Sequence, residues 1–275
     1  GNVNVEGDIK KIDVKFADKN DPAAPESSHE LTVSGNAEEA RVNNGNATIN
    51  TVGNLTAFDE AGENVRLTVN ENNNIVIERD VIDQITGDVR KTQTVTAKVS
   101  DGGSLTVKDL DVFDNADASF KGDITVKGDA KDFIIGSVNN LEFNNGVDGD
   151  LTIGTSVKSI TAKDADGNLK DITGTLNVAQ NTGEITVGNV GGNATFGNAQ
   201  GKVTTSDITG ALDVTKNTGE INVGNVGGNA TFGDAQGKVT TSDITGALEV
   251  TKNTGEITVG NVGGKMTLGD AQGAV

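Results

Sequence analysis

The sequence predicts an all-β chain that folds as a parallel β-solenoid, either a β-helix or a flattened β-roll. Three observations lead to this fold class. Segments 183–218 and 219–254 are 36-residue copies that differ at three positions, and a third, truncated copy occupies 255–275. Each copy divides into four phrases of nine residues that begin with Gly. Apolar and polar residues alternate within each phrase, as in half-buried strands, and strands this short bury their apolar side only by stacking on one another.

The third, fifth and eighth positions of a phrase are expected to point into the solenoid, and the second and fourth to point outward. The inward positions are mostly aliphatic or small, namely Ile185, Val187, Val190, Ala194, Phe196, Ala199, Ile208, Leu212 and Val214. The outward positions include columns of Thr, namely Thr186, Thr195, Thr204, Thr231, Thr240, Thr258 and Thr267. Gly at the start of a phrase, as in Gly183, Gly192 and Gly201, allows the chain to turn with a positive φ.

Some inward positions carry polar side chains, and these need hydrogen-bond partners if they are buried. They are Asn181, Asn217 and Asn253 at position eight, and Thr205 and Thr241 at position five. Identical side chains stacked on successive rungs can bond to one another, as in amide ladders. We therefore expect structural ladders of Asn and Thr inside the solenoid.

The number of residues in one rung stays open between 18 and 27. Two nine-residue phrases per turn give 18, and the 36-residue copy is then two whole rungs. Three phrases per turn give 27, which does not divide 36. We favour 18 because it keeps the Asn and Thr columns aligned.

The regular solenoid is expected over 101–275, and 1–100 is expected to be an irregular continuation of it. The alternative for 1–100 is a separate small β domain. Segment 18–30 holds both prolines and is expected to be a surface loop. Segment 78–91 has apolar residues at helical spacing but contains Gly87, so a short helix and a charged excursion both remain possible.

Composition excludes several classes of protein. The net charge of −18 disfavours nucleic acid as a partner, because that needs a basic face, and it disfavours anionic membrane surfaces. No apolar run is long enough to insert into a membrane. The absence of Cys excludes disulfides and thiolate metal sites. The absence of Cys excludes a Cys–His pair, and His29, the only His, lies in the expected loop, so no catalytic residue is predicted.

Calcium is the one cofactor that the sequence leaves possible. Asp164, Asp166 and Asn168 alternate as an oxygen-ligand loop would, although Gly167 and the missing late Glu depart from the EF-hand pattern. Asx also recurs at the seventh position of the phrases, which adds Asp234, Asp243 and Asp270 as calcium candidates. The alternative is that all of these are turn residues that bond to their own backbone.

Other functions are weaker alternatives. The nine-residue period resembles that of RTX calcium-binding repeats, but the paired early glycines and the fixed Asp of that family are missing, so its calcium sites are not carried over. The outward Thr columns suggest ice binding as one remote alternative function. The fold suggests a polysaccharide-active enzyme with paired carboxylates as another. Four sequons also occur, at Asn46, Asn54, Asn193 and Asn229.

The acidic, Cys-free phrases such as GNVGGNATFGDAQGKVTTSDITGALEV resemble the repetitive β-solenoid parts of bacterial cell-surface proteins, meaning S-layer proteins and large secreted adhesins. This resemblance implies an extracellular, structural and non-enzymatic segment of a longer secreted protein. It would form a rigid rod or lattice tile that self-associates through its lateral faces or its ends. The alternative within the same resemblance is an adhesin stalk or passenger that binds a host or surface ligand.

Overall fold

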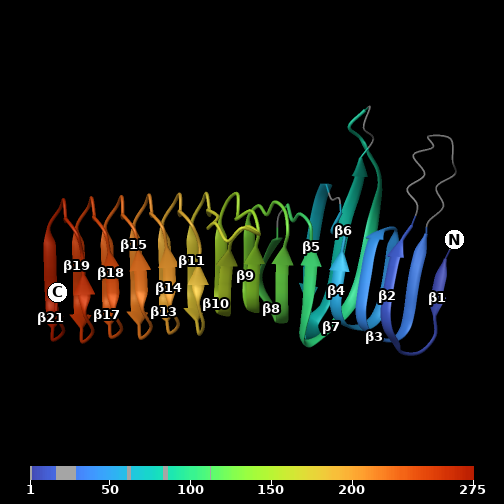
Figure 1. Cartoon of the computed structure of the whole chain (residues 1–275), viewed down its shortest axis with the longest axis horizontal. Helices are drawn as coiled ribbons and strands as arrows, with labels where there is room; N and C mark the ends of the chain where they lie inside the picture. Colours follow the sequence, from blue (N-terminus) through green and yellow to red (C-terminus); the bar gives the residue numbers. More distant parts are fainter. Residues whose placement is uncertain (1, 17–28, 61–62, 83–85, 112) are drawn as a thin grey trace.

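The fold is a parallel β-solenoid, as the sequence predicts. The computed structural model describes residues 2–16, 29–60, 63–82, 86–111 and 113–275. The chain coils through about 13 turns around one continuous apolar core. Figure 1 shows an elongated molecule with its two termini at opposite ends.

The elements of the N-terminal half are β1 (Val3–Val5), β2 (Ile9–Lys15), β3 (Glu30–Asn44), β4 (Asn46–Ala57), β5 (Glu63–Asn70), the 3-10 turn η1 (Glu71–Asn73), β6 (Asn74–Ile82), β7 (Val89–Val107), β8 (Phe113–Val126), β9 (Phe133–Phe143) and β10 (Leu151–Ala162). The strands of the C-terminal half are β11 (Leu176–Asn181), β12 (Ile185–Thr186), β13 (Ala194–Ala199), β14 (Val203–Thr205), β15 (Leu212–Asn217), β16 (Ile221–Val223), β17 (Ala230–Ala235), β18 (Val239–Thr241), β19 (Leu248–Asn253), β20 (Ile257–Thr258) and β21 (Met266–Ala271).

One rung of the repeats contains 18 residues. Ala194 pairs with Leu212, which pairs with Ala230 on the next rung, always in parallel. Two successive nine-residue phrases therefore complete one turn, and they differ in structure. One phrase forms a strand of six residues such as β13, and the other forms a strand of two or three residues such as β14 followed by a bridge residue. The bridge residues form a third parallel column, which contains Ile172, Val190, Ile208, Val226, Ile244 and Val262.

The 36-residue copy is two rungs because large and small core residues alternate along each column. Phe196 lies between Val178 and Val214, and Leu212 lies between Ala194 and Ala230. All of the inward residues predicted from the first copy are 0–1% exposed. A large side chain on one rung thus fills the space that a small one leaves on the next, which gives the close packing of a protein interior.

The corner glycines are required for a reason other than the predicted one. Gly183, Gly192 and Gly201 do not have a positive φ. A Cβ on Gly201 would instead overlap the backbone of Gly183 one rung below. Close approach of two backbones, and not a left-handed turn, excludes a side chain at this corner.

Of the two alternatives left open for 78–91, the short helix is wrong for the residues that the structure describes. β6 and β7 form an antiparallel hairpin there, with Ile82 opposite Val89, and this hairpin projects from the solenoid in Figure 1. The pairing continues from β7 through β6 to β5 on one side of the molecule. There β5 meets β8, where Asn115 Nδ2 donates to the Val69 carbonyl at 2.8 Å.

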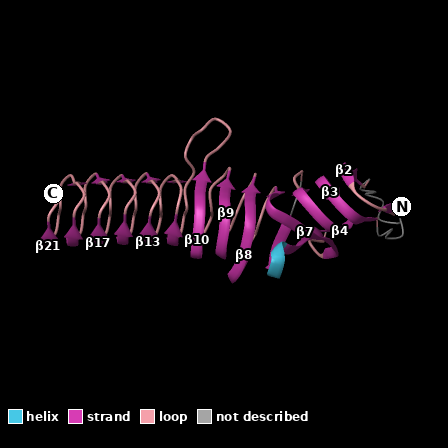
Figure 2. Cartoon of the chain, turned by 90° about the horizontal axis from the view of Figure 1, so that it is seen from below, coloured by secondary structure: helices cyan, strands magenta, loops and turns pink. Residues whose placement is uncertain are grey.

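The strands β5 and β6, which pair in an antiparallel manner, are therefore inserted on one face of the solenoid only. On the other face, β7 pairs directly with β8, with Leu105 beside Ile124. Each inserted strand adds about 4.8 Å to one face, so the axis bends. Figure 2 shows the N-terminal strands β2, β3, β4 and β7 inclined to the regular stack that follows β8.

Asn73 joins the two sides at this bend. It is 1% exposed, and its φ of 59° lies in the left-handed region. Its Nδ2 donates to Asp101 Oδ1 at 3.0 Å, and its Oδ1 accepts the Lys121 N–H at 2.9 Å. One amide side chain thus connects η1 to β7 and β8.

The expected surface loop at 18–30 lies almost entirely outside the described residues. His29, the one His, is partly buried and not an exposed loop residue. Its ring stacks on Phe16 at 5.2 Å between centroids, and its carbonyl accepts the Asn46 N–H at 2.9 Å. The boundary expected at residue 100 falls inside β7 (Val89–Val107).

Candidate functional site

The inward Asn and Thr residues do not form the expected ladders. Ala199 lies between Asn181 and Asn217 in the same column, so like residues recur only on every second rung. The Nδ2 atoms of Asn181, Asn217 and Asn253 instead donate to the carbonyls two residues ahead, at 2.7–3.0 Å. These amides are 0–1% exposed and bond to their own corner of the chain.

Thr205 and Thr241 are separated in the same way. Val223 lies between them, and the Thr205 hydroxyl donates to the Ser206 carbonyl at 3.2 Å. The 18-residue rung is the one we favoured, and it does align the Asn residues in one column and the Thr residues in another, but only on every second rung. The unit of two rungs places these polar residues alternately with apolar ones.

The outward Thr column includes one covered member. Thr186 lies between Thr161 and Thr204, yet it is only 8% exposed. Its hydroxyl donates to Glu184 Oε1 at 2.9 Å.

The loop at 163–170 is closed by its own side chains. Asp164 Oδ1 accepts the N–H groups of Asp166 at 3.0 Å and Asn168 at 2.9 Å. Its Oδ2 accepts Asn168 Nδ2 and lies 3.0 Å from Lys170 Nζ. The Asn168 amide, and then the Lys170 ammonium, hold the pKa of Asp164 well below its usual range. Both oxygens of the first calcium candidate are thus engaged in an Asx turn.

Asp243 belongs to a column in which Asp and Asn alternate at the solenoid corner. Asn225 and Asn261 lie on either side of it. Asp243 Oδ1 accepts both the backbone N–H of Asn261 at 2.8 Å and its Nδ2 at 3.2 Å. The column consists of Asp171, Asn189, Asp207, Asn225, Asp243 and Asn261. Asn189 and Asn225 each separate two carboxylates that would otherwise repel one another in adjacent rungs.

Asp234 and Asp270 lie in a different column, on the outward side of the six-residue strands. Lys252 lies between them in register, and Asp234 Oδ2 accepts Gln236 Nε2 at 2.7 Å. The calcium candidates are therefore distributed over three separate places. Among the described residues, no three His, Asp or Glu side chains are grouped as a metal ion would need.

A shallow hollow lies beside the 163–170 loop. Its polar groups bond to one another, since Thr173 Oγ1 donates to Asp148 Oδ1 at 2.9 Å and accepts the Gly149 N–H at 2.8 Å. Its lining residues are Asn145, Val147, Asp148, Leu169, Lys170, Asp171 and Thr173. Nothing in this lining provides a free nucleophile or a pair of free carboxylates.

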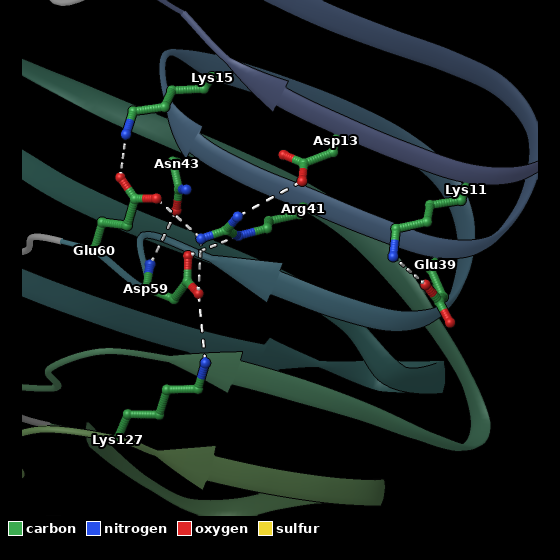
Figure 3. A network of polar contacts seen from close by, with 9 residues as sticks. All are labelled: Lys11, Asp13, Lys15, Glu39, Arg41, Asn43, Asp59, Glu60 and Lys127. Carbon is green, nitrogen blue, oxygen red and sulfur yellow. Dashed lines mark hydrogen bonds and ion pairs between the residues drawn. The ribbon is translucent and has the colours of Figure 1, made fainter.

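The most extensive polar cluster is a charge network near the N-terminal end (Figure 3). Arg41 Nε lies 3.1 Å from Asp59 Oδ1, and Arg41 Nη2 lies 3.0 Å from Glu60 Oε1. Asp13 lies 3.6 Å from the same guanidinium, and Lys127 lies 3.4 Å from Asp59. Hydrogen bonding to Asp59 raises the pKa of Arg41.

This network connects strands that are distant in sequence. Arg41 is on β3, Asp59 and Glu60 follow β4, and Lys127 follows β8. Asp59 has a side chain only 8% exposed, and its N–H donates to the buried Asn43 Oδ1 at 3.3 Å. Sequence analysis missed this cluster because the rungs of the N-terminal part differ in length, so no fixed period brings these residues together.

All four sequon asparagines use their side-chain oxygens within the fold. Asn46 Oδ1 accepts the Thr94 N–H, and Asn54 Oδ1 accepts the Ser104 hydroxyl, both at 2.9 Å. Asn193 and Asn229 accept the N–H groups of Ala211 and Ala247 on the next rung, both at 2.9 Å.

Comparison of the chain with protein-family models, with curated proteins and with solved structures finds no match. The described residues contain no helix of the length and apolarity that crossing a membrane requires. The fold therefore defines the chain as a parallel β-solenoid, and its function is argued from the arrangement of its residues.

Proposed function

We propose that this chain is a structural, non-enzymatic segment of a bacterial cell-surface protein, which acts as an extracellular rod or lattice tile. One observation carries the proposal: the 36-residue copy corresponds to two interlocking rungs, so adding copies lengthens the same stack. A solenoid in which each rung contacts only its neighbours grows in one dimension without a new core. Length and stiffness are the properties that such duplication supplies.

The ionisable residues support a bracing role. Arg66 Nη1 lies 2.8 Å from Asp80 Oδ2, Arg41 bonds to Asp59, and Asp243 accepts the backbone of the next rung. These groups neutralise or cap one another across strands. A catalytic acid or base needs to reach a substrate, and groups engaged in this way are poor candidates for that role.

In the proposed function, copies of the chain associate with one another through their lateral faces and so build the lattice. The experiment is to purify the chain and examine it by electron microscopy and sedimentation velocity, in millimolar calcium and in chelator. Sheets or ordered fibres are expected. A chain that stays monomeric at every calcium concentration and at high protein concentration would overturn the lattice proposal.

An adhesin stalk is the second candidate function, and the N-terminal part favours it. The β6–β7 hairpin and the charge network of Figure 3 distinguish this part from the regular repeats, as a ligand site would. In this case the purified chain stays monomeric and is retained on immobilised glycans or host cells. Retention that is lost in Arg41→Ala and kept in the repeat variant Lys202→Ala would support the stalk.

A further inference from the structure

The outward side of the six-residue strands in the repeats carries charges on both sides of a central column. We call this surface the repeat face. On rung β15, Asp213 and Lys216 lie on either side of Thr215, and on rung β19, Glu249 and Lys252 lie on either side of Thr251. Asp213 in the first copy corresponds to Glu249 in the second, so this position, one of the three that differ between the copies, keeps its negative charge.

The Lys side chains of the repeat face are not neutralised within the described chain. In their column, Asp234 lies between Lys216 and Lys252, Asp270 follows Lys252, and Asn198 precedes Lys216. Even so, no carboxylate among the described residues lies within 4.0 Å of either ammonium, and the ion pair that the copies do form is Lys238–Glu256 at 3.9 Å on the opposite side. These charges are available to a partner.

The partner that matches this pattern is a second copy of the same face. A two-fold axis parallel to the solenoid and above the Thr215–Thr251 column places each rung against the same rung of the other copy. It exchanges the two sides of the face, so Asp213 faces Lys216 of the second copy, and Glu249 faces Lys252. Such an interface is isologous, and every pair in it is formed twice.

We propose that the repeat face associates with the same face of a second copy through this two-fold axis. This inference rests on the proposed lattice function and names the lateral face that the lattice uses. An antiparallel arrangement is the competing geometry, and it pairs Lys252 with Asp234 of the second copy. The same antiparallel axis pairs Lys216 with Asp270. The parallel axis is favoured because it pairs residues of one rung, so each of its pairs lies within a single 36-residue copy and recurs in each such copy, whereas position 198, the counterpart of Asp234 and Asp270, is Asn.

Two charge variants test the proposal. On rungs β15 and β19, Lys216→Glu with Lys252→Glu makes both sides of the face negative, and Asp213→Lys with Glu249→Lys makes both sides positive. Each variant alone is expected to lose self-association, and a mixture of the two is expected to associate about tenfold more tightly than either alone. Sedimentation equilibrium at moderate salt measures this. The matched control is Lys202→Glu with Lys238→Glu, which makes the same charge change on the opposite side and should leave association unchanged.

The alternatives give different results. Association of the Asp213→Lys, Glu249→Lys variant on its own would overturn the parallel axis and indicate the antiparallel one. Association of both variants at the parent level would overturn the repeat face and leave the lattice function standing. A parent chain that never associates overturns both.

The absence of Cys allows a direct geometric test. The two-fold axis places residue 215 opposite itself, so Thr215→Cys should form a disulfide-linked dimer under mild oxidation about ten times faster than Asn222→Cys on the other side. Equal rates would contradict the proposed axis. Circular dichroism of each variant verifies that the fold is retained.

Discussion

Asp164 shows how a pattern typical of a calcium loop is satisfied by the chain itself. Its carboxylate accepts hydrogen bonds from two backbone N–H groups and from the Asn168 amide, and it contacts the Lys170 ammonium. All of these interactions favour the charged form of the carboxyl group. A cation would have to displace the Lys170 ammonium before it could bind there.

The pKa of Asp164 is the first prediction. Because its pKa is lowered in the folded chain, the turn gains stability above the unfolded value of about 3.9. That gain is lost as the pH falls through the lower, folded pKa. NMR titration of the Asp164 carboxyl should give a midpoint well below 3.9, and Asn168→Ala or Lys170→Ala should raise it. A midpoint near the ordinary value in the parent chain would contradict the Asx turn.

Phe232 carries the second prediction. It is fully buried, and smaller Val side chains lie beside it on the rungs above and below, at Val214 and Val250. Phe232→Ala should lower the free energy of unfolding by about 3–5 kcal/mol, because neither neighbour can fill the cavity. The neighbouring outward change Thr231→Ala should cost no more than about 0.5 kcal/mol. Urea denaturation compares the two, and equal costs would refute alternate packing of large and small residues.

At the scale of elements, the junction between η1, β7 and β8 decides where the solenoid bends. The inserted strands β5 and β6 widen one face, and Asn73 connects the diverging strands through two hydrogen bonds. The neighbouring Asn72 is also in a left-handed conformation, with φ of 60°, but it is exposed.

Asn73→Gly is the third prediction. Gly tolerates the left-handed φ, so this substitution removes the hydrogen bonds without adding strain. The Lys121 N–H, whose hydrogen bond to Asn73 is partly buried, then loses its acceptor, which should cost about 0.5–1.5 kcal/mol. Hydrogen exchange at the Lys121 amide should accelerate, whereas Asn72→Gly should leave it unchanged. If the two variants behave alike, the amide of Asn73 does not hold the junction.

The sequence was sufficient to predict the fold class and the inward residues of the repeats, because alternation over short strands depends on local order alone. It did not distinguish the two kinds of phrase, since a six-residue strand and a short strand with a bridge carry similar alternation. The β6–β7 hairpin was missed because Val81, Ile85 and Val89 also fit a helical period. The charge network of Figure 3 depends on rungs of unequal length, which only the folded chain reveals.

At the scale of the whole molecule, alternation between rungs explains why the duplicated unit has 36 residues and not 18. In the core, Leu alternates with Ala and Phe alternates with Val, and at the corner Asp alternates with Asn. Glu220 lies on the rung between those of Lys202 and Lys238. These columns place unlike residues side by side, whereas the outward column that contains Thr186 and Thr204 also places like residues together. A unit of one rung would place like charges and like shapes in contact.

Deletion of whole rungs is the fourth prediction. Removing 219–254 deletes two rungs and preserves the alternation, so the remaining chain should fold with a denaturation midpoint close to that of the parent. Removing 219–236 deletes one rung and brings Leu212 against Leu248, Lys216 against Lys252 and Asp207 against Asp243. This shorter deletion should lower the free energy of unfolding by at least about 2 kcal/mol, through repulsion between like charges and poor packing.

The larger deletion is the matched control, because it removes twice as much stacked surface and still keeps unlike neighbours together. In a solenoid whose stability came only from the number of rungs, the chain lacking two rungs would be the less stable one. Thermal and urea denaturation of the two deletions, followed by circular dichroism, therefore separate the two explanations. If the chain lacking one rung were the more stable, the alternation would be a trace of duplication and not the reason that the repeat is two rungs long.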